Sequence, residues 1–288
     1  MTGFALSLIL TAALLHATWN LCSKRAGGGL PWVWLVSILI CTAYVPVVAT
    51  LGLRGQIHLT TSAVLWIIGS GVLKTSYSLF LQKSYRSGDF SLVYPLARGT
   101  GPLLSTLGAI ILFSERPSPT AILGALLIVG AVFTFAGGTR LLHETTAHLR
   151  RAAAYGAGTG AFIAAYTLWD KHGVSGLGIQ PVVYDAGTAY TQLILLTPFA
   201  LGRRAEALHH WRVHRGYAFG MALLAPTAYI LVLTAVRIAP LSAVAPAREV
   251  SIVIGAYLGA RVLDEQDGRR RLIAAAVMAL GVVALVLG

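Results

Sequence analysis

The sequence predicts an all-α integral membrane protein with ten transmembrane helices, arranged as two five-helix repeats of inverted topology. Three observations lead to this fold class. The 288 residues are 56% hydrophobic and only 11% charged, whereas soluble domains carry about 25% charged residues. Apolar runs of about 20 residues recur along the chain, and a helix of that length crosses the hydrocarbon core of a bilayer. A pattern of polar residues also occurs twice.

The repeat places equivalent residues 150 positions apart. A tryptophan followed by a polar residue, an Ala-Arg pair and a glutamate each occur once in either half. The equivalent positions are Trp19-Asn20 with Trp169-Asp170, Ala97-Arg98 with Ala247-Arg248, and Glu115 with Glu265. An internal repeat of this kind predicts two structurally related halves.

Ten apolar segments account for most of the chain. They cover residues 3–23, 31–52, 62–82, 90–113, 119–139, 152–171, 181–202, 216–236, 241–262 and 271–287. Five of them form a first repeat in residues 1–140 and five form a second repeat in residues 152–288, with residues 141–151 as the connecting loop. Because five is odd, the second repeat enters the membrane in the opposite sense to the first, which makes the topology inverted.

Lysine and arginine are distributed unevenly between the loops. Fifteen lie in loops that follow odd-numbered segments and four lie on the other side. Since cytoplasmic loops are enriched in these residues, both termini are expected on the extracytoplasmic side of the cell membrane. The net charge of +12 then reflects topology, and we expect no nucleic-acid partner. The longest connectors, 140–151 and 203–215, are predicted to be solvated cytoplasmic loops.

Sequence motifs for cofactor or metal chemistry are absent. Cys22 and Cys41 are too few for a disulfide framework or a metal site, and no Walker, dinucleotide or His-Glu-x-x-His motif occurs. We therefore expect no cofactor and no metal. An intramembrane enzyme is a distant alternative, since residues 173–176 match the Gly-x-Ser-Gly of rhomboid-type proteases. No later apolar segment contains a histidine to activate Ser175, so we predict that the protein is not an enzyme.

The repeat and its residues resemble the EamA-type branch of the drug/metabolite transporter superfamily. The resemblance rests on two five-helix halves, on Trp19-Asn20 and Trp169-Asp170 late in the first and sixth segments, and on Glu115 and Glu265 before the last segment of each half. It implies secondary transport of small metabolites such as amino acids through a central cavity formed by both halves. Many relatives are described with cytoplasmic termini, whereas the distribution of lysine and arginine in this chain predicts extracytoplasmic termini.

Ionisable residues inside the apolar segments are the first candidates for the site, because each costs about 2.5–3.5 kcal/mol at the centre of a membrane helix unless it is paired or faces a cavity. They are His16, Lys74, Arg98, Asp170, Asp185, Arg248 and Glu249. Arg98 and Arg248 lie about eight residues into oppositely directed helices and so flank the bilayer midplane. Guanidinium groups match carboxylate and phosphate oxygens, which favours an anionic or zwitterionic substrate, and Lys74 strengthens that reading.

A purely structural role for these charges is the alternative. Arg248 would then be neutralised by Glu249 or Asp170, and Arg98 by Asp185 or a carbonyl group, so that the pairs lock helices together. Adjacent residues on a helix diverge by about 100°, so Glu249 could instead meet Lys74 or His16. An intermediate case is a salt bridge that opens when substrate or a proton arrives.

Polar faces on the first and sixth segments supply further candidates. His16, Trp19 and Asn20 share one face, and Tyr166, Trp169 and Asp170 form the equivalent face of the second half. Trp19 and Trp169 would either contact substrate or anchor the helices at the membrane interface. Tyr77 and Tyr94 are candidate hydroxyls of the cavity.

Prolines mark candidate hinges of a moving helix. Residues 95–102 contain two prolines and two glycines around Arg98, which predicts a discontinuity in the fourth segment. Pro95 and its counterpart Pro246 are the predicted hinges, and the fourth and ninth segments are expected to cross tightly. Glu115 and Glu265 are expected to cap helices or to form surface ion pairs.

These residues predict a secondary transporter that works by alternating access. Its substrate would be an amino acid or an organic phosphate or phosphonate, with export favoured, and Arg98, Arg248, Lys74, His16, Asn20, Trp19, Trp169 and Tyr94 would form the binding site. Proton coupling through Asp170, Glu249 or His16 is a further hypothesis. The alternative is a proton-coupled exporter of cationic drugs that uses Glu249 or Asp170. The expected partners are the substrate and the lipid bilayer, and both a monomer and a homodimer stay open.

Overall fold

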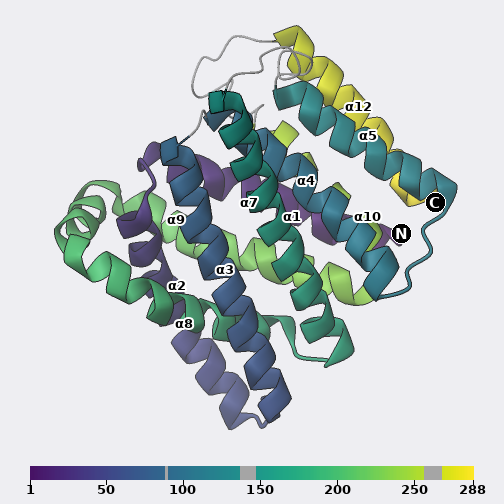
Figure 1. The fold of residues 1–288 in the computed structure, drawn as a ribbon. Coiled ribbons are helices and arrows are strands. Elements are labelled where there is room, and N and C mark those ends of the chain that lie inside the picture. The colour runs from purple at the N-terminus through teal and green to yellow at the C-terminus, as the bar shows by residue number, and fades with distance from the viewer. Residues whose placement is uncertain (88–89, 137–146, 256–267) are drawn as a thin grey trace.

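The protein is a bundle of long helices (Figure 1). The computed structural model describes residues 1–87, 90–136, 147–255 and 268–288. Within these ranges, side chains are described except at Lys24, 82–87, 90–96, 133, 135–136, 147–153 and 268–272. The regular elements of the described residues are all helical and include no β-strand, which confirms the prediction of an all-α protein.

Helices coincide with the predicted apolar segments. The long helices are α1 (Gly3–Arg25), α2 (Leu30–Leu53), α3 (Thr61–Ser87), α4 (Phe90–Leu112), α5 (Pro119–Ala136), α7 (Ala147–Lys171), α8 (Pro181–Ala200), α9 (Arg204–Ile238) and α12 (Gly268–Leu287), and the short ones are η1 (His172–Gly176), η2 (Leu201–Arg203) and α10 (Leu241–Ala247). Each predicted segment overlaps one of them. The number of membrane crossings, the inverted arrangement and the division into two repeats stay predictions.

Several helices are long and apolar enough to cross a bilayer. Among the described residues these are Gly3–Ser23, Leu30–Leu53, Thr61–Leu81 and Pro181–Ile238. The last stretch contains 58 residues, and at 1.5 Å per residue it would be about 87 Å long against a hydrocarbon core of about 30 Å. It is therefore too long for one crossing, and η2 interrupts it between α8 and α9.

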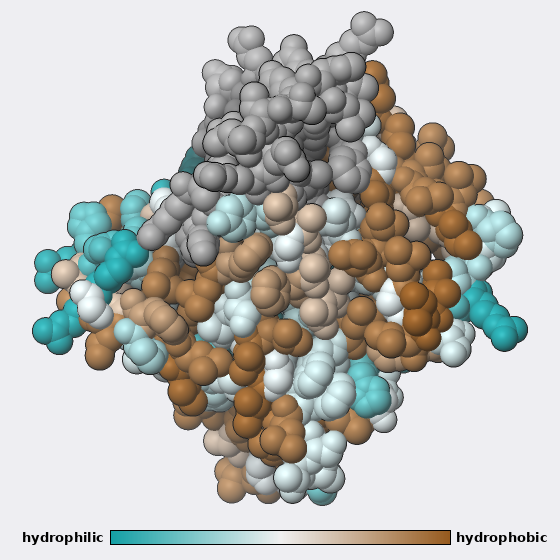
Figure 2. Space-filling model, in the orientation of Figure 1, coloured by the Kyte–Doolittle hydropathy of each residue, from teal (hydrophilic) through white to brown (hydrophobic). Residues whose placement is uncertain are grey.

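The surface carries many large apolar side chains (Figure 2). Leu53, Ile111, Ile194 and Leu223 are between 69% and 91% exposed. Such extensive exposure of aliphatic side chains marks a surface that contacts lipid. This surface agrees with the prediction of an integral membrane protein.

Glycines allow two helix pairs to approach closely. α4 packs most extensively against α7, where a Cβ atom at Gly101 would lie 2.9 Å from Cγ2 of Ile163. In the pair α5 and α12, a Cβ atom at Gly124 would lie 2.6 Å from the carbonyl oxygen of Gly281. The predicted contact between the fourth and ninth segments exists between α4 and α10, but it is less extensive than the contact of α4 with α7.

The predicted helix discontinuity occurs in the other half of the chain. α4 is continuous through the glycines and Pro102, whereas the ninth segment breaks after α10, where Arg248 and Glu249 form a turn. Pro246 has no N–H to donate to the carbonyl group of Ser242, and the hydroxyl of Thr106 donates to that carbonyl oxygen at 3.4 Å. The ninth segment can break here because α4 satisfies the released backbone group.

The predicted solvated loop at 203–215 is also wrong, because residues 204–215 form the first turns of α9. His214 alone departs from helical geometry there, with φ −122° and ψ 21°. Arginine, alanine, glutamate and leucine favour helix, so the charge of this segment did not imply an irregular structure. In the other long connector, residues 147–151 belong to α7 and residues 140–146 lie outside the described residues.

We predict that Gly124→Ala lowers the free energy of unfolding by about 1–3 kcal/mol, because the new methyl group overpacks the contact of α5 with α12. Thermal unfolding of the purified protein in detergent measures the change. Gly130→Ala is the matched control on the same helix, since a Cβ atom there has nothing within 4 Å. Equal unfolding temperatures of the two variants would contradict the prediction.

Candidate substrate site

The ionisable residues of the predicted site gather in two groups inside the bundle. The aspartate cluster consists of Ser70 and Lys74 on α3, Asp170 on α7, Asp185, Tyr184 and Thr188 on α8, Tyr44 on α2 and Tyr229 on α9. The arginine cluster consists of Arg98 on α4, His16 on α1, and Arg248, Glu249 and Ser251 after α10. The ions that the sequence singles out therefore lie together, as a cavity site requires.

Asp170 is the most completely enclosed carboxylate of the two clusters, with 1% of its surface exposed. Its carboxylate accepts hydrogen bonds from Ser70 Oγ at 2.5 Å, from the Tyr184 hydroxyl at 2.9 Å and from the Tyr229 hydroxyl. Lys74 Nζ lies 3.3 Å from the same carboxylate. Ser70 and Lys74 reach it together because they are one turn apart on α3. Removing a carboxylate from water is costly, and these partners offset that cost.

Lys74 also connects Asp170 to Asp185. Its ammonium group lies 4.0 Å from Asp185 Oδ1 and donates to Thr188 Oγ1 at 3.2 Å. The other oxygen of Asp185 accepts a hydrogen bond of 2.6 Å from the Tyr44 hydroxyl. One lysine therefore joins two carboxylates, and the cluster ties α2, α3, α7, α8 and α9 together.

Arg98 is paired with Glu249 in the arginine cluster. Its Nε atom lies 2.9 Å from Glu249 Oε2, and its Nη2 atom donates to Ser251 Oγ at 2.9 Å. The alternatives in which Arg98 meets Asp185, or Glu249 meets Lys74, are therefore wrong. Glu249 reaches Arg98 because the turn after α10 directs this side chain toward α4 while its neighbour Arg248 points elsewhere.

Arg248 has a different environment from Arg98. Among the described residues, no carboxylate lies within 4.0 Å of its guanidinium group, so the expected neutralisation by Glu249 or Asp170 does not occur. Its Cζ atom instead lies 6.0 Å from the centroid of the Tyr229 ring, within range of a cation–π contact. Arg248 is thus a partly buried cation without a carboxylate partner among the described residues.

Tyr229 joins the two clusters. Its hydroxyl donates to Asp170, while its ring contacts Lys74 Nζ at 4.1 Å and Arg248 at 6.0 Å. Pro226 lies three residues earlier inside α9 and removes one backbone hydrogen bond of that helix. Sequence reasoning missed Tyr229, and a tyrosine one turn after a proline in an apolar segment was the available signal.

The formal charges are distributed unevenly between the clusters. Lys74 lies near the two carboxylates of the aspartate cluster, whereas the arginine cluster contains Arg98 and Arg248 with the single carboxylate of Glu249, which pairs with Arg98. The three cations and three carboxylates balance in number. The aspartate cluster nevertheless has an excess carboxylate and the arginine cluster an excess guanidinium group, so the interior is polarised.

The polar face of α1 borders the arginine cluster. His16 lies within electrostatic reach of both arginines, and its ring meets that of Trp19 edge-on with centroids 4.7 Å apart. The buried Nε1 atom of Trp19 has no hydrogen-bond partner among the described residues. The amide of Asn20 donates to the carbonyl oxygen of His16 at 2.7 Å, so this donor is used within the helix. Trp19 therefore offers a buried donor that a ligand would satisfy.

Trp169 is engaged in packing between α3 and α7. Its ring stacks on Trp66 with centroids 4.0 Å apart, and each indole N–H donates to the backbone carbonyl of the other residue, at 2.7 and 2.8 Å. Gly69 gives this ring its space, because a Cβ atom there would lie 2.5 Å from Trp169 Cζ2. The N–H of Trp169 is thus already used, and its predicted role in binding substrate gains no support.

The remaining predicted residues divide into two groups. Pro246 lies in α10 just before the turn of Arg248 and Glu249, whereas Tyr94 and Pro95 belong to α4 but their side chains lie outside the described residues. Glu115 caps α10, because its carboxylate accepts from the N–H groups of Leu241 and Ser242 at 2.8 and 2.9 Å. Its repeat counterpart Glu265 lies outside the described residues.

The serine of the protease-like match lies in η1. Its hydroxyl, that of Ser175, donates to the carbonyl oxygen of Val236 at 3.2 Å, and Lys171 Nζ donates to the same oxygen at 2.7 Å. These bonds tie η1 to the end of α9. They give Ser175 a packing role and no feature of an activated nucleophile.

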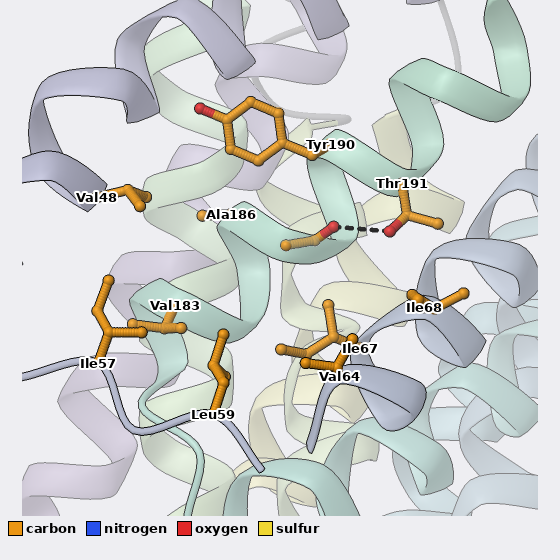
Figure 3. Close-up of a pocket in the computed structure, with 11 residues that line it drawn as sticks. Val48, Ile57, Leu59, Val64, Ile67, Ile68, Val183, Ala186, Tyr190 and Thr191 are labelled. Atoms are coloured by element: carbon orange, nitrogen blue, oxygen red, sulfur yellow. Dashed lines mark hydrogen bonds between the residues drawn. The ribbon is translucent and has the colours of Figure 1, made fainter. Parts of the chain in front are cut away.

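A separate pocket of about 270 Å³ lies between α2, α3 and α8 (Figure 3). Its walls are aliphatic apart from Tyr190 and Thr191, and both hydroxyls already donate to backbone carbonyl groups, those of Cys41 and Gly187. Among the described residues, no lysine, arginine, histidine, aspartate or glutamate lines it. It is therefore distinct from the two charged clusters and unsuited to an anionic ligand.

A polar interior enclosed by helices with an apolar exterior defines the class: this is an integral membrane protein. Residues 3–137 match the EamA-like transporter family. This match covers the first predicted repeat and is consistent with the predicted resemblance to an EamA-type transporter of the drug/metabolite transporter superfamily.

The fold is shared with solved structures. A crystal structure described only as that of a protein is similar over 98% of each chain, with a TM-score of 0.76 and 17% sequence identity. No curated protein matches the sequence. The family match thus supports the predicted resemblance, and the structural likeness shows a shared fold. The ten membrane crossings, the inverted repeats, the substrate, the direction of transport and the orientation of the termini stay predictions.

We predict that Asp170→Asn destabilises the protein by about 3–5 kcal/mol, because it removes one partner of a buried ion pair and leaves Lys74 with less compensation. Unfolding temperature in detergent measures the loss. Glu206→Gln is the control, since its pair with Arg203 is exposed and such pairs contribute about 0–1 kcal/mol. A similar, small change in both variants would show that the aspartate cluster does not hold the helices.

Proposed function

We propose that this protein is a secondary transporter that moves a small anionic or zwitterionic metabolite across the cell membrane by alternating access. The substrate class is an amino acid or an organic phosphate or phosphonate, and export is the favoured direction. The observation that carries this proposal is Arg248, a guanidinium group inside the bundle without a carboxylate partner among the described residues. A buried cation of this kind is compensated when an anionic ligand binds.

Arg248 is the proposed primary contact of the substrate's anionic group. A guanidinium group binds a carboxylate or phosphate through two parallel hydrogen bonds. The unpartnered N–H of Trp19 would donate to the same ligand, and His16 lies beside both. Arg98 is already engaged with Glu249, so we assign it to a supporting role.

The Arg98–Glu249 pair is the proposed mobile contact. It connects α4 to the turn after α10. In this turn the backbone N–H of Glu249 donates to the carbonyl oxygen of Pro246, three residues earlier. Opening this pair would free the turn to move relative to α4. Pro246 is therefore the proposed hinge of the second half, and Pro95 is its proposed counterpart in the first.

Glu249 is the proposed proton carrier. Asp170 accepts hydrogen bonds from three hydroxyl groups in addition to its contact with Lys74, and protonation would disturb all of them. Among the described residues, the side chain of Glu249 instead pairs with Arg98 alone, so its protonation would release a single pair. A cationic-drug exporter is the second candidate, and it is disfavoured because Arg248 would repel a cation.

Arg248→Ala tests the proposed substrate site. The purified protein is reconstituted in liposomes, and counterflow of labelled amino acids, organic phosphates, phosphonates and cationic dyes is measured. We expect counterflow of an anionic or zwitterionic compound, with an apparent affinity reduced about 10- to 100-fold in the variant, because a charge-assisted hydrogen bond contributes about 1.5–3 kcal/mol.

Arg54→Ala is the control for that measurement, since Arg54 is exposed outside both clusters. Normal counterflow by Arg248→Ala would assign this arginine a structural role. Movement of cationic dyes alone would favour the drug exporter.

Glu249→Gln tests proton coupling. In liposomes that contain a pH-sensitive dye, we expect the variant to lose substrate-driven proton movement while substrate-for-substrate counterflow continues, because counterflow requires no net proton transfer. Glu206→Gln serves as the exposed control. Proton movement that persists in Glu249→Gln would exclude this carboxylate as the carrier.

A further inference from the structure

The first turns of α9 form a basic helical surface at the edge of the bundle. In Figure 1 the green chain reverses direction between α8 and α9 at the left of the view, and Figure 2 shows hydrophilic and hydrophobic side chains side by side there. Residues 203–215 contain four arginines and one glutamate. Nothing in the proposed transport cycle uses this surface.

The inner side of this segment is anchored to the bundle. Ala207 is buried, and the ring of His210 meets that of the fully buried Trp32 with centroids 5.7 Å apart. Just beyond the segment, the Tyr217 hydroxyl accepts a hydrogen bond from Arg25 at 3.3 Å. The segment is therefore held in a defined orientation against α1 and α2.

The outer side carries the charge. Arg204, Leu208 and Arg212 recur every four residues, so they share one face of the helix, and all three are exposed, as is Arg215. In the part of the chain that the structure describes, no carboxylate lies within 4.0 Å of Arg204, Arg212 or Arg215. Arg203, in contrast, forms an exposed pair with Glu206. Arg204 and Arg212 thus lie one turn to either side of the exposed Leu208, and Arg215 adds a third exposed guanidinium group at the end of the segment.

This surface continues into one that contacts lipid. Leu201 precedes it, and Phe219 and Leu223 follow it, with exposures of 52%, 56% and 69%. The non-helical geometry at His214 separates the basic turns from the apolar remainder of α9. A basic surface that borders exposed apolar side chains on both sides is typical of the level where phospholipid headgroups begin.

We propose that Arg204, Arg212 and Arg215 form a binding surface for the headgroups of anionic phospholipids, with Leu208 inserted at the boundary of the acyl chains. Guanidinium groups donate to phosphate oxygens, and clustered arginines beside a membrane helix attract an anionic lipid surface. Because this surface is continuous with the exposed apolar side chains of α8 and α9, a lipid is a more suitable ligand than a soluble acidic partner.

The test compares spin-labelled phosphatidylglycerol with spin-labelled phosphatidylcholine in liposomes that contain the protein. We expect the wild-type protein to associate with phosphatidylglycerol at least about fivefold more strongly, the effect expected of one interfacial arginine. The triple variant Arg204→Gln, Arg212→Gln and Arg215→Gln should lose this preference. The triple variant Arg54→Gln, Arg116→Gln and Arg237→Gln removes the same charge from exposed arginines elsewhere and should keep it.

Salt provides a second measurement on the unmodified protein. At about 1 M salt the screening length falls to about 3 Å, so the preference of the wild-type protein should decrease. Equal association of both lipids with the wild-type protein would overturn the proposal. The proposal would also be overturned if the preference for phosphatidylglycerol persisted both at high salt and in the Arg204, Arg212 and Arg215 triple variant. Loss of this preference in the control variant would overturn it too.

Discussion

Compensation of the Asp170 carboxylate is the interaction on which the rest of the structure depends. A carboxylate inside a membrane helix is unfavourable unless charge and hydrogen bonds surround it. Its partners come from other helices: Ser70 and Lys74 on α3, Tyr184 on α8 and Tyr229 on α9. The need to satisfy one buried group thus sets the relative positions of α3, α7, α8 and α9, while the apolar side chains of these helices have no preference between each other and lipid.

The arginine cluster follows from a second local constraint. Pro246 lacks an N–H, the ninth segment turns at Arg248 and Glu249, and the freed carbonyl of Ser242 accepts from Thr106 on α4. This turn sends Glu249 to Arg98 and leaves Arg248 beside the Tyr229 ring. The excess guanidinium group, which suits an anionic ligand, is therefore a consequence of where the helix breaks.

Much of the fold could be predicted because burial in lipid demands long apolar helices, which hydropathy reveals directly. The candidate residues could be found for the same reason, since any ion in such a segment is exceptional. The charged turns at 204–215 were mispredicted because polarity excludes a segment from the hydrocarbon core without preventing it from being helical. The discontinuity was expected around Arg98, yet four proline and glycine residues there are accommodated in α4 while one proline accompanies the break after α10.

The amino-acid sequence by itself determined the helical membrane class, the family resemblance and the small set of buried ions, because these depend on composition and on patterns of residues along the chain. Only the tertiary structure decided which ions pair. Arg98 meets Glu249 across 151 positions and Lys74 meets Asp170 across 96, and local periodicity carries no information about such partners. The roles of Tyr229 and Trp66 were hidden for the same reason: a hydroxyl or an aromatic ring in an apolar segment is unremarkable until the chain brings its partner alongside.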